Sequence, residues 1–148
     1  MLSKDLIKIF ERDLNQLIKE IELYKNEKNL WKLDKDLKNS AGNLCLHLIG
    51  NLNHFIGAQL GNSGYIRQRE LEFSLKNVPV AKLKEEIEIT KELVKYALLK
   101  LKNDDLINEY PLNVFGAPMS TQYFLVHLTT HLAYHLGQIN YHRRLLDN

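Results

Sequence analysis

The sequence predicts an all-α protein, a four-helix bundle with crossover connections. Three observations predict it: four long segments with apolar residues spaced by three and four, little strand signal, and segments with glycine or proline between them. A chain of 148 residues fits a single domain over residues 1–148 and is long enough to bury its own core.

The first helix is expected from about Ser3 to Asn29, because one face is apolar and lysines and glutamates fill the other. The second is expected from Ala41 to about Leu60, after Ser40 as N-cap. It is uncharged, which indicates a helix that is buried on most sides. Its glycines then indicate close packing against neighbouring segments. The apolar stripe of the first helix consists of Leu6, Phe10, Leu14, Leu17, Ile18, Ile21 and Tyr24.

The third helix is expected from about Val80 to Lys102, after a connector over residues 61–79. Residues 103–120 contain two prolines and a glycine, so they predict a loop, and its length suggests a functional role. Ser120 or Thr121 caps the last helix, which continues to about Leu146. The long connections after the second and third helices leave room for crossovers.

The last helix holds four of the six histidines, and His127, His131 and His135 share one of its faces with Gln138. Residues four apart can close around one ion, whereas residues seven apart are separated by roughly 10 Å of helix rise. His131 can therefore pair with His127 or with His135. The uncharged second helix can add a third ligand, which completes a three-histidine site with an open face.

Geometry leaves open whether His47 or His54 would be that third ligand, since these two are also seven apart. The alternative is that all these histidines are hydrogen-bonded core residues. A zinc metalloprotease is excluded, because Leu132 stands where that pattern requires a glutamate.

Two segments resemble the DinB-like family of four-helix-bundle proteins, which overlaps the thiol-transferase and metal-dependent hydrolase bundles. They are NLCLHLIGNLNHFIGAQLG and HLAYHLGQI, and RQRELEF after the first resembles an uncharacterised branch of that family. The resemblance implies that His47, His131 and His135 bind a divalent metal, zinc or nickel. It also implies crossover connections and homodimers, but no known substrate. Leu136 departs from the arginine or small residue of many relatives, which bears on substrate chemistry.

Other polar residues near these histidines each allow two interpretations. Gln138 either orients a metal ligand or substrate by a hydrogen bond, or serves helix packing. Asn51 has the same possible role or, as the favoured alternative, forms an interhelical hydrogen bond. His54 and His127 are proton carriers or, as the favoured alternative, hydrogen-bonded core histidines. Arg67 and Arg69 either bind an anionic substrate group or lie in a solvated loop. Cys45 is expected to be a buried structural thiol, and Glu70 and Glu72 are the only carboxylates that qualify at all as general bases.

Two functions remain open. The first is a metal-dependent enzyme that acts on a small molecule, by hydrolysis or by transfer to a low-molecular-weight thiol. The second is a non-catalytic helical binding or stress-response protein with structural histidines. The net charge of +2 gives no support for a nucleic-acid partner. No apolar run is long enough for a membrane span, so no membrane association is expected. With one cysteine and no signal peptide expected, a cytoplasmic location follows by default.

Overall fold

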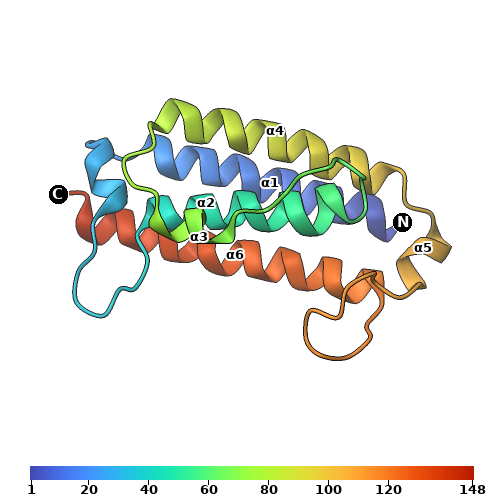
Figure 1. The fold of residues 1–148 in the computed structure, drawn as a ribbon. Coiled ribbons are helices and arrows are strands. Elements are labelled where there is room, and N and C mark those ends of the chain that lie inside the picture. Colours follow the sequence, from blue (N-terminus) through green and yellow to red (C-terminus); the bar gives the residue numbers. More distant parts are fainter.

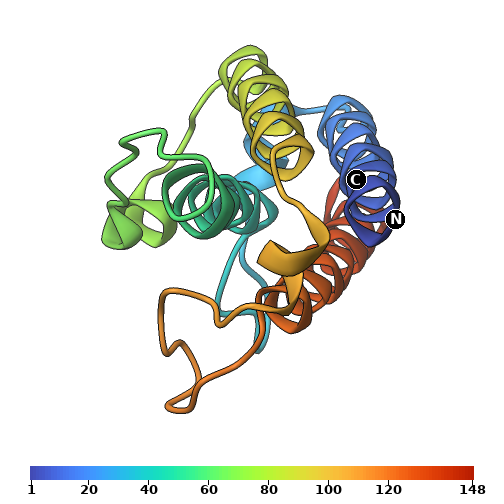
Figure 2. The same cartoon turned by 90° about the vertical axis from the view of Figure 1, so that its right-hand side faces the viewer.

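The computed structural model describes all 148 residues, and it confirms the all-α prediction. The four long helices α1 (Leu2–Glu22), α2 (Ala41–Leu52), α4 (Val80–Leu99) and α6 (Thr121–Leu146) lie side by side (Figures 1 and 2). Helix α1 packs against α4 and α6, and α2 packs against the same two helices. None of the helices has the length and apolar character needed to span a membrane.

Short helices extend or join the long ones. A π-helix, η2 (Asn53–Ala58), continues α2, which accounts for the long second helix predicted from sequence. A 3₁₀ helix, η1 (Glu27–Trp31), follows α1, and two short helices that were not predicted, α3 (Arg69–Ser74) and α5 (Asn103–Ile107), lie in the connections. The core is one cluster of 28 buried apolar residues, and it contains all seven residues of the predicted apolar stripe.

The connections differ from each other. Residues 61–79 run back along the bundle, so that α2 and α4 point in the same direction (Figure 1). The second connection, through α5, instead stays at one end of the bundle, where the backbone N–H of Tyr110 donates to the carbonyl of Met119 over 2.9 Å. Of these two connections, only residues 61–79 form a crossover. A DinB-like arrangement of the bundle stays a prediction.

Helix α1 ends at Glu22, earlier than the Asn29 expected from sequence. The reason is a contact with the far end of the chain. The carboxylate of Asp147 accepts hydrogen bonds from the backbone N–H groups of Lys25 and Asn26, at 2.6 and 3.3 Å, and from the side chain of Asn29 at 2.8 Å. The acceptor of these three hydrogen bonds lies 118 or more positions away in the sequence. The local spacing of apolar residues therefore does not reveal where α1 ends.

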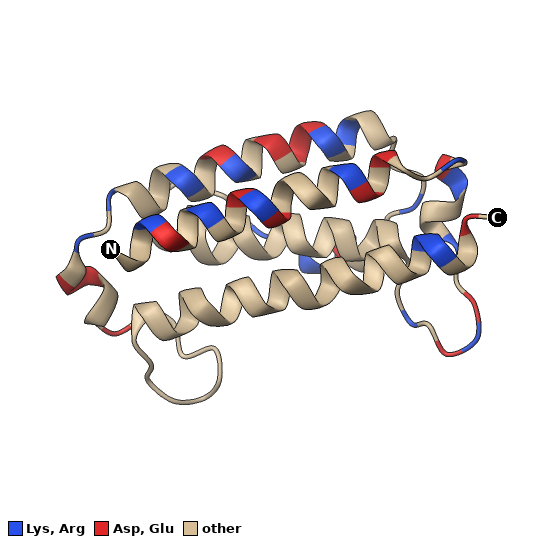
Figure 3. Cartoon of the chain, turned by 180° about the vertical axis from the view of Figure 1, so that it is seen from behind, with Lys and Arg blue, Asp and Glu red and all other residues tan.

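Charge is distributed unevenly over the helices. Lysines, arginines and acids cover the outer sides of α1 and α4, whereas α6 carries no charged residue before Arg143 (Figure 3). Helix α2 is uncharged throughout. The side of the molecule built by α2 and α6 is therefore where the uncharged polar side chains, and the histidines among them, come together.

Candidate metal centre

Three histidines from two helices meet between α2 and α6. His47 lies on α2, and His131 and His135 follow one another by one turn on α6. Their ring centroids are 5.1 Å (His47–His131), 5.3 Å (His47–His135) and 4.6 Å (His131–His135) apart. One nitrogen of each ring lies within 4.8 Å of the others, so the cluster can hold a metal ion. These are the three histidines that the family resemblance implied. Of the two candidates from the predicted second helix, the cluster contains His47 and not His54.

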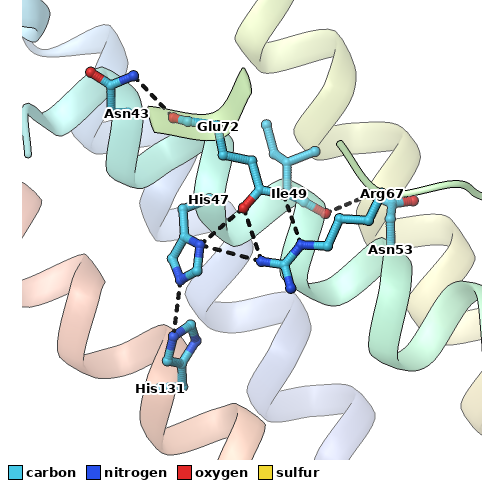
Figure 4. A network of polar contacts seen from close by, with 7 residues as sticks. All are labelled: Asn43, His47, Ile49, Asn53, Arg67, Glu72 and His131. Atoms are coloured by element: carbon cyan, nitrogen blue, oxygen red, sulfur yellow. Dashed lines mark hydrogen bonds and ion pairs between the residues drawn. The ribbon is translucent and has the colours of Figure 1, made fainter. Parts of the chain in front are cut away.

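A carboxylate fixes the orientation of His47. Nδ1 of His47 lies 3.0 Å from Oε1 of Glu72, while Nε2 points toward His131 (Figure 4). A carboxylate only accepts hydrogen bonds, so Nδ1 carries the proton and Nε2 presents its lone pair to the cluster. Metal-bound histidines commonly have such a carboxylate partner, which sets the tautomer and raises the basicity of the ring.

Arg67 holds Glu72 in this position. Its Nε and one terminal nitrogen donate to the two carboxylate oxygens of Glu72 over 2.8 and 2.9 Å (Figure 4). Burial alone would raise the pKa of Glu72. The hydrogen bonds from His47 and Arg67 and the charge of Arg67 outweigh burial and lower it, so the carboxylate stays ionised. The side chain of Arg67 is only 11% exposed, so the expectation of a solvated arginine is wrong.

Gly50 makes room for this ion pair. A Cβ atom at Gly50 would lie 2.6 Å from Cδ of Glu72, and closer still to one of its oxygens. The sequence indicated Glu72 only as a candidate general base, because residues 61–79 were predicted to be a connector between helices. The glycine within an uncharged helix was the available signal, since it indicates that something polar or bulky approaches the backbone.

The two histidines on α6 have unlike partners. Nδ1 of His135 lies 2.7 Å from Oε1 of Gln138, so the amide oxygen accepts a hydrogen bond from the Nδ1–H group and Nε2 is left free. Nδ1 of His131 is buried without a partner, and its Nε2 lies 3.3 Å from Nε2 of His47. Burial, followed by the neighbouring His135 and His47, lowers the pKa of His131 to about 4. Burial also lowers the pKa of His135.

These features fit a metal ion. Metal binding requires neutral imidazoles, and the depressed pKa values of His131 and His135 keep both rings neutral near neutral pH. Three imidazole nitrogens suit zinc, nickel or copper rather than magnesium or calcium. Besides Nδ1 of His131, Oδ1 of Asn51 is the only buried side-chain polar atom without a partner in the chain, and Asn51 lies one turn from His47. Asn51 thus makes neither of the expected kinds of contact through this oxygen.

The remaining candidate residues lie outside the cluster. His54 packs edge-on against Phe55, with ring centroids 4.7 Å apart, and His127 stacks on Phe124 at 5.8 Å. Neither ring forms a hydrogen bond within the chain, so the favoured prediction of hydrogen-bonded core histidines is wrong for both. Arg69 is exposed and lies over the ring of Phe73, 5.1 Å from its centroid.

Two further residues have structural roles. His142, the fourth histidine of α6, is buried away from the cluster, and its ring forms hydrogen bonds with the hydroxyl of Tyr24 at 2.7 Å and the carbonyl of Lys32 at 2.9 Å. Cys45 is fully buried, and burial raises the pKa of its thiol to about 12, as expected of a structural cysteine.

No family model matches the chain, and no curated protein matches it either. The fold and the site therefore define the class on their own: an all-α protein whose three-histidine cluster, built by α2 and α6, can hold a metal ion. The resemblance to the DinB-like family stays an expectation from sequence.

Proposed function

We propose that the protein is a divalent-metal-dependent enzyme that acts on a small molecule through His47, His131 and His135. The observation that carries this proposal is the oriented set of imidazole nitrogens, with His47 held by Glu72 at 3.0 Å and His135 by Gln138 at 2.7 Å. Three nitrogen ligands leave room for water or substrate, the pattern of catalytic rather than structural zinc sites. Zinc or nickel is the expected metal.

A bound cation would supply one of two chemistries: it would acidify a water molecule for hydrolysis, or hold a thiolate for transfer of a low-molecular-weight thiol. The residues around the cluster include no free carboxylate, since Glu72 is engaged by His47 and Arg67. The proton carrier we propose is His127. Its ring centroid lies 6.2 Å from that of His131, and its nitrogens have no partner in the chain.

The alternative is a non-catalytic helical binding or stress-response protein. The contact between Nε2 of His47 and Nε2 of His131, at 3.3 Å, favours it, because a hydrogen bond there would join the two rings without a metal. Metal uptake separates the enzyme from a protein whose histidines are purely structural, and turnover separates it from a protein that binds metal without catalysis.

The first experiment measures metal content and zinc and nickel affinity of protein purified without a polyhistidine tag. We expect near-stoichiometric metal in the wild type and in His127→Ala, the matched control from one turn away on the same helix. His131→Ala should lose the metal. A wild-type protein that takes up neither zinc nor nickel would refute the proposal.

The second experiment concerns turnover by the metal-loaded protein. Conjugation of cysteine to an aromatic halide would indicate thiol transfer, and release of nitrophenol from a nitrophenyl ester would indicate hydrolysis. Either activity should disappear on chelation and in His131→Ala. Metal uptake with no turnover in either assay would favour the binding protein.

A further inference from the structure

A cleft of about 830 Å³ lies between the segment 34–39 and the second half of α6. Its volume falls within the range typical of small-molecule sites. Four apolar side chains on its walls are strongly exposed: Leu37 (45%), Tyr134 (66%), Tyr141 (63%) and Leu145 (66%). Exposed apolar residues that gather along one cleft are typical of a binding surface rather than of an ordinary protein exterior.

The cleft is continuous with the histidine cluster. His135, one of its three histidines, lines the cleft, and so does Gln138, whose Oε1 lies 2.7 Å from Nδ1 of His135. A molecule bound in the cleft therefore lies against a member of the cluster. The cleft extends from there toward Leu145, along the last turns of α6.

The charges on the cleft cancel. The segment 34–39 contributes Asp34 and Asp36 together with Lys35 and Lys38, and α6 contributes no charged residue to the lining. A nucleotide or another phosphorylated ligand would need an excess of cationic donors, which this lining does not provide. An uncharged ligand loses nothing by the absence of such donors and gains from the apolar walls.

We propose that the cleft binds an uncharged molecule with an aromatic or aliphatic body, and that its polar end reaches the cluster at His135. The body lies along Tyr141 and Leu145. This inference deepens the proposed function and rests on it for the chemistry at the polar end. The substrate class follows from the residues that line the cleft and not from the identity of the metal.

The test compares two probes that share one metal-binding head: imidazole, and an imidazole whose ring nitrogen carries a phenylhexyl chain (phenylhexylimidazole). The chain is needed because Leu145 lies ten residues beyond His135 on α6, about 15 Å along the helix, which a directly attached phenyl ring does not span. Both probes are titrated into the zinc-loaded full chain, and the leucine methyl signals are followed by NMR. We expect phenylhexylimidazole to bind at least about tenfold more tightly than imidazole, since its chain and phenyl ring are removed from water. The methyl signals of Leu37 and Leu145 should shift only with phenylhexylimidazole.

Leu145→Ser should abolish most of that gain and leave the affinity for imidazole unchanged. Leu99→Ser is the matched control, because Leu99 is similarly exposed (60%) but lies on α4 and not in the cleft. Equal affinities for the two probes, or a gain that survives Leu145→Ser, would overturn the inference. A chain that takes up no zinc would refute the proposed function alone. Phenylhexylimidazole would then be titrated into the metal-free protein, where shifts at Leu37 and Leu145 support the cleft and their absence overturns it.

Discussion

Gly50→Ala offers the sharpest test of how the cluster is positioned. An alanine in a helix interior is ordinarily about 1 kcal/mol more stable than a glycine. At position 50, however, the new methyl carbon would lie 2.6 Å from Cδ of Glu72. Carbon atoms in contact are separated by roughly 3.5–4 Å, so the carboxyl group would have to move by about 1 Å.

That movement breaks a defined set of contacts. A shift of about 1 Å carries the 3.0 Å bond between His47 and Glu72 beyond hydrogen-bond range. Loss of such a carboxylate partner typically lowers metal affinity about ten- to hundredfold. The disturbed buried ion pair with Arg67 costs about 1–3 kcal/mol, which cancels or exceeds the gain in helix propensity. We therefore expect weaker zinc binding and no increase in the free energy of unfolding.

Gly137→Ala is the matched control, since a Cβ atom there meets nothing within 4 Å. It should stabilise the protein by roughly 0.5–1 kcal/mol and leave zinc affinity unchanged. The assay combines isothermal titration with zinc and urea unfolding of the metal-free variants. In a Glu72→Ala background, where the clash is gone, Gly50→Ala should be stabilising. If Gly50→Ala keeps wild-type zinc affinity, or if its cost persists in the Glu72→Ala background, the reasoning is refuted.

Four further predictions concern single residues. The pKa of His131 lies near 4 in the folded chain against its ordinary value of 6.5, so the unfolded state binds more protons in between. The unfolding free energy of the metal-free protein should therefore rise with pH over this window, and urea titrations should show a smaller rise in His131→Leu. Gln138→Ala should weaken zinc binding about tenfold, with little effect on the urea midpoint because Gln138 is exposed. His142→Ala should lower the unfolding free energy by about 2–4 kcal/mol through its buried hydrogen bonds, while zinc affinity measured at a temperature where the variant is folded stays unchanged. The expected homodimer would pack through the uncharged outer face of α6, where Val126 is exposed. Sedimentation should therefore show a dimer, and Val126→Glu should dissociate it. A wild-type protein that stays monomeric at all concentrations would contradict this prediction.

The sequence predicts the parts of this molecule that depend on local periodicity. The apolar stripe of the first helix is buried as expected, and the spacing of His131 and His135 on one helix limits which histidines can meet. Spacing did not decide between His47 and His54, because both lie in the helix predicted over residues 41–60, seven residues apart, and only the packing of α2 against α6 selects one. The family resemblance implied His47.

What the sequence did not predict depends on contacts between distant segments. Glu72 is 25 positions from His47, on a six-residue helix that is too short to show a period. The early end of α1 depends on Asp147, near the other end of the chain. Neither contact leaves a local pattern, although Gly50 indicated that something must approach the backbone of α2.

Asp147 has a consequence for the dynamics of the cleft. The terminal turn of a helix commonly frays, and its amides then exchange quickly with solvent. Here three hydrogen-bond donors from the segment after α1 hold Asp147, directly after the last turn of α6. That turn carries Leu145 and Leu146, which line the cleft. We therefore expect that wall to be ordered before any ligand arrives, so that binding costs little entropy to organise it. Amide exchange in the final turn of α6 should consequently be as slow as in the middle of the helix, and Asp147→Ala should accelerate it.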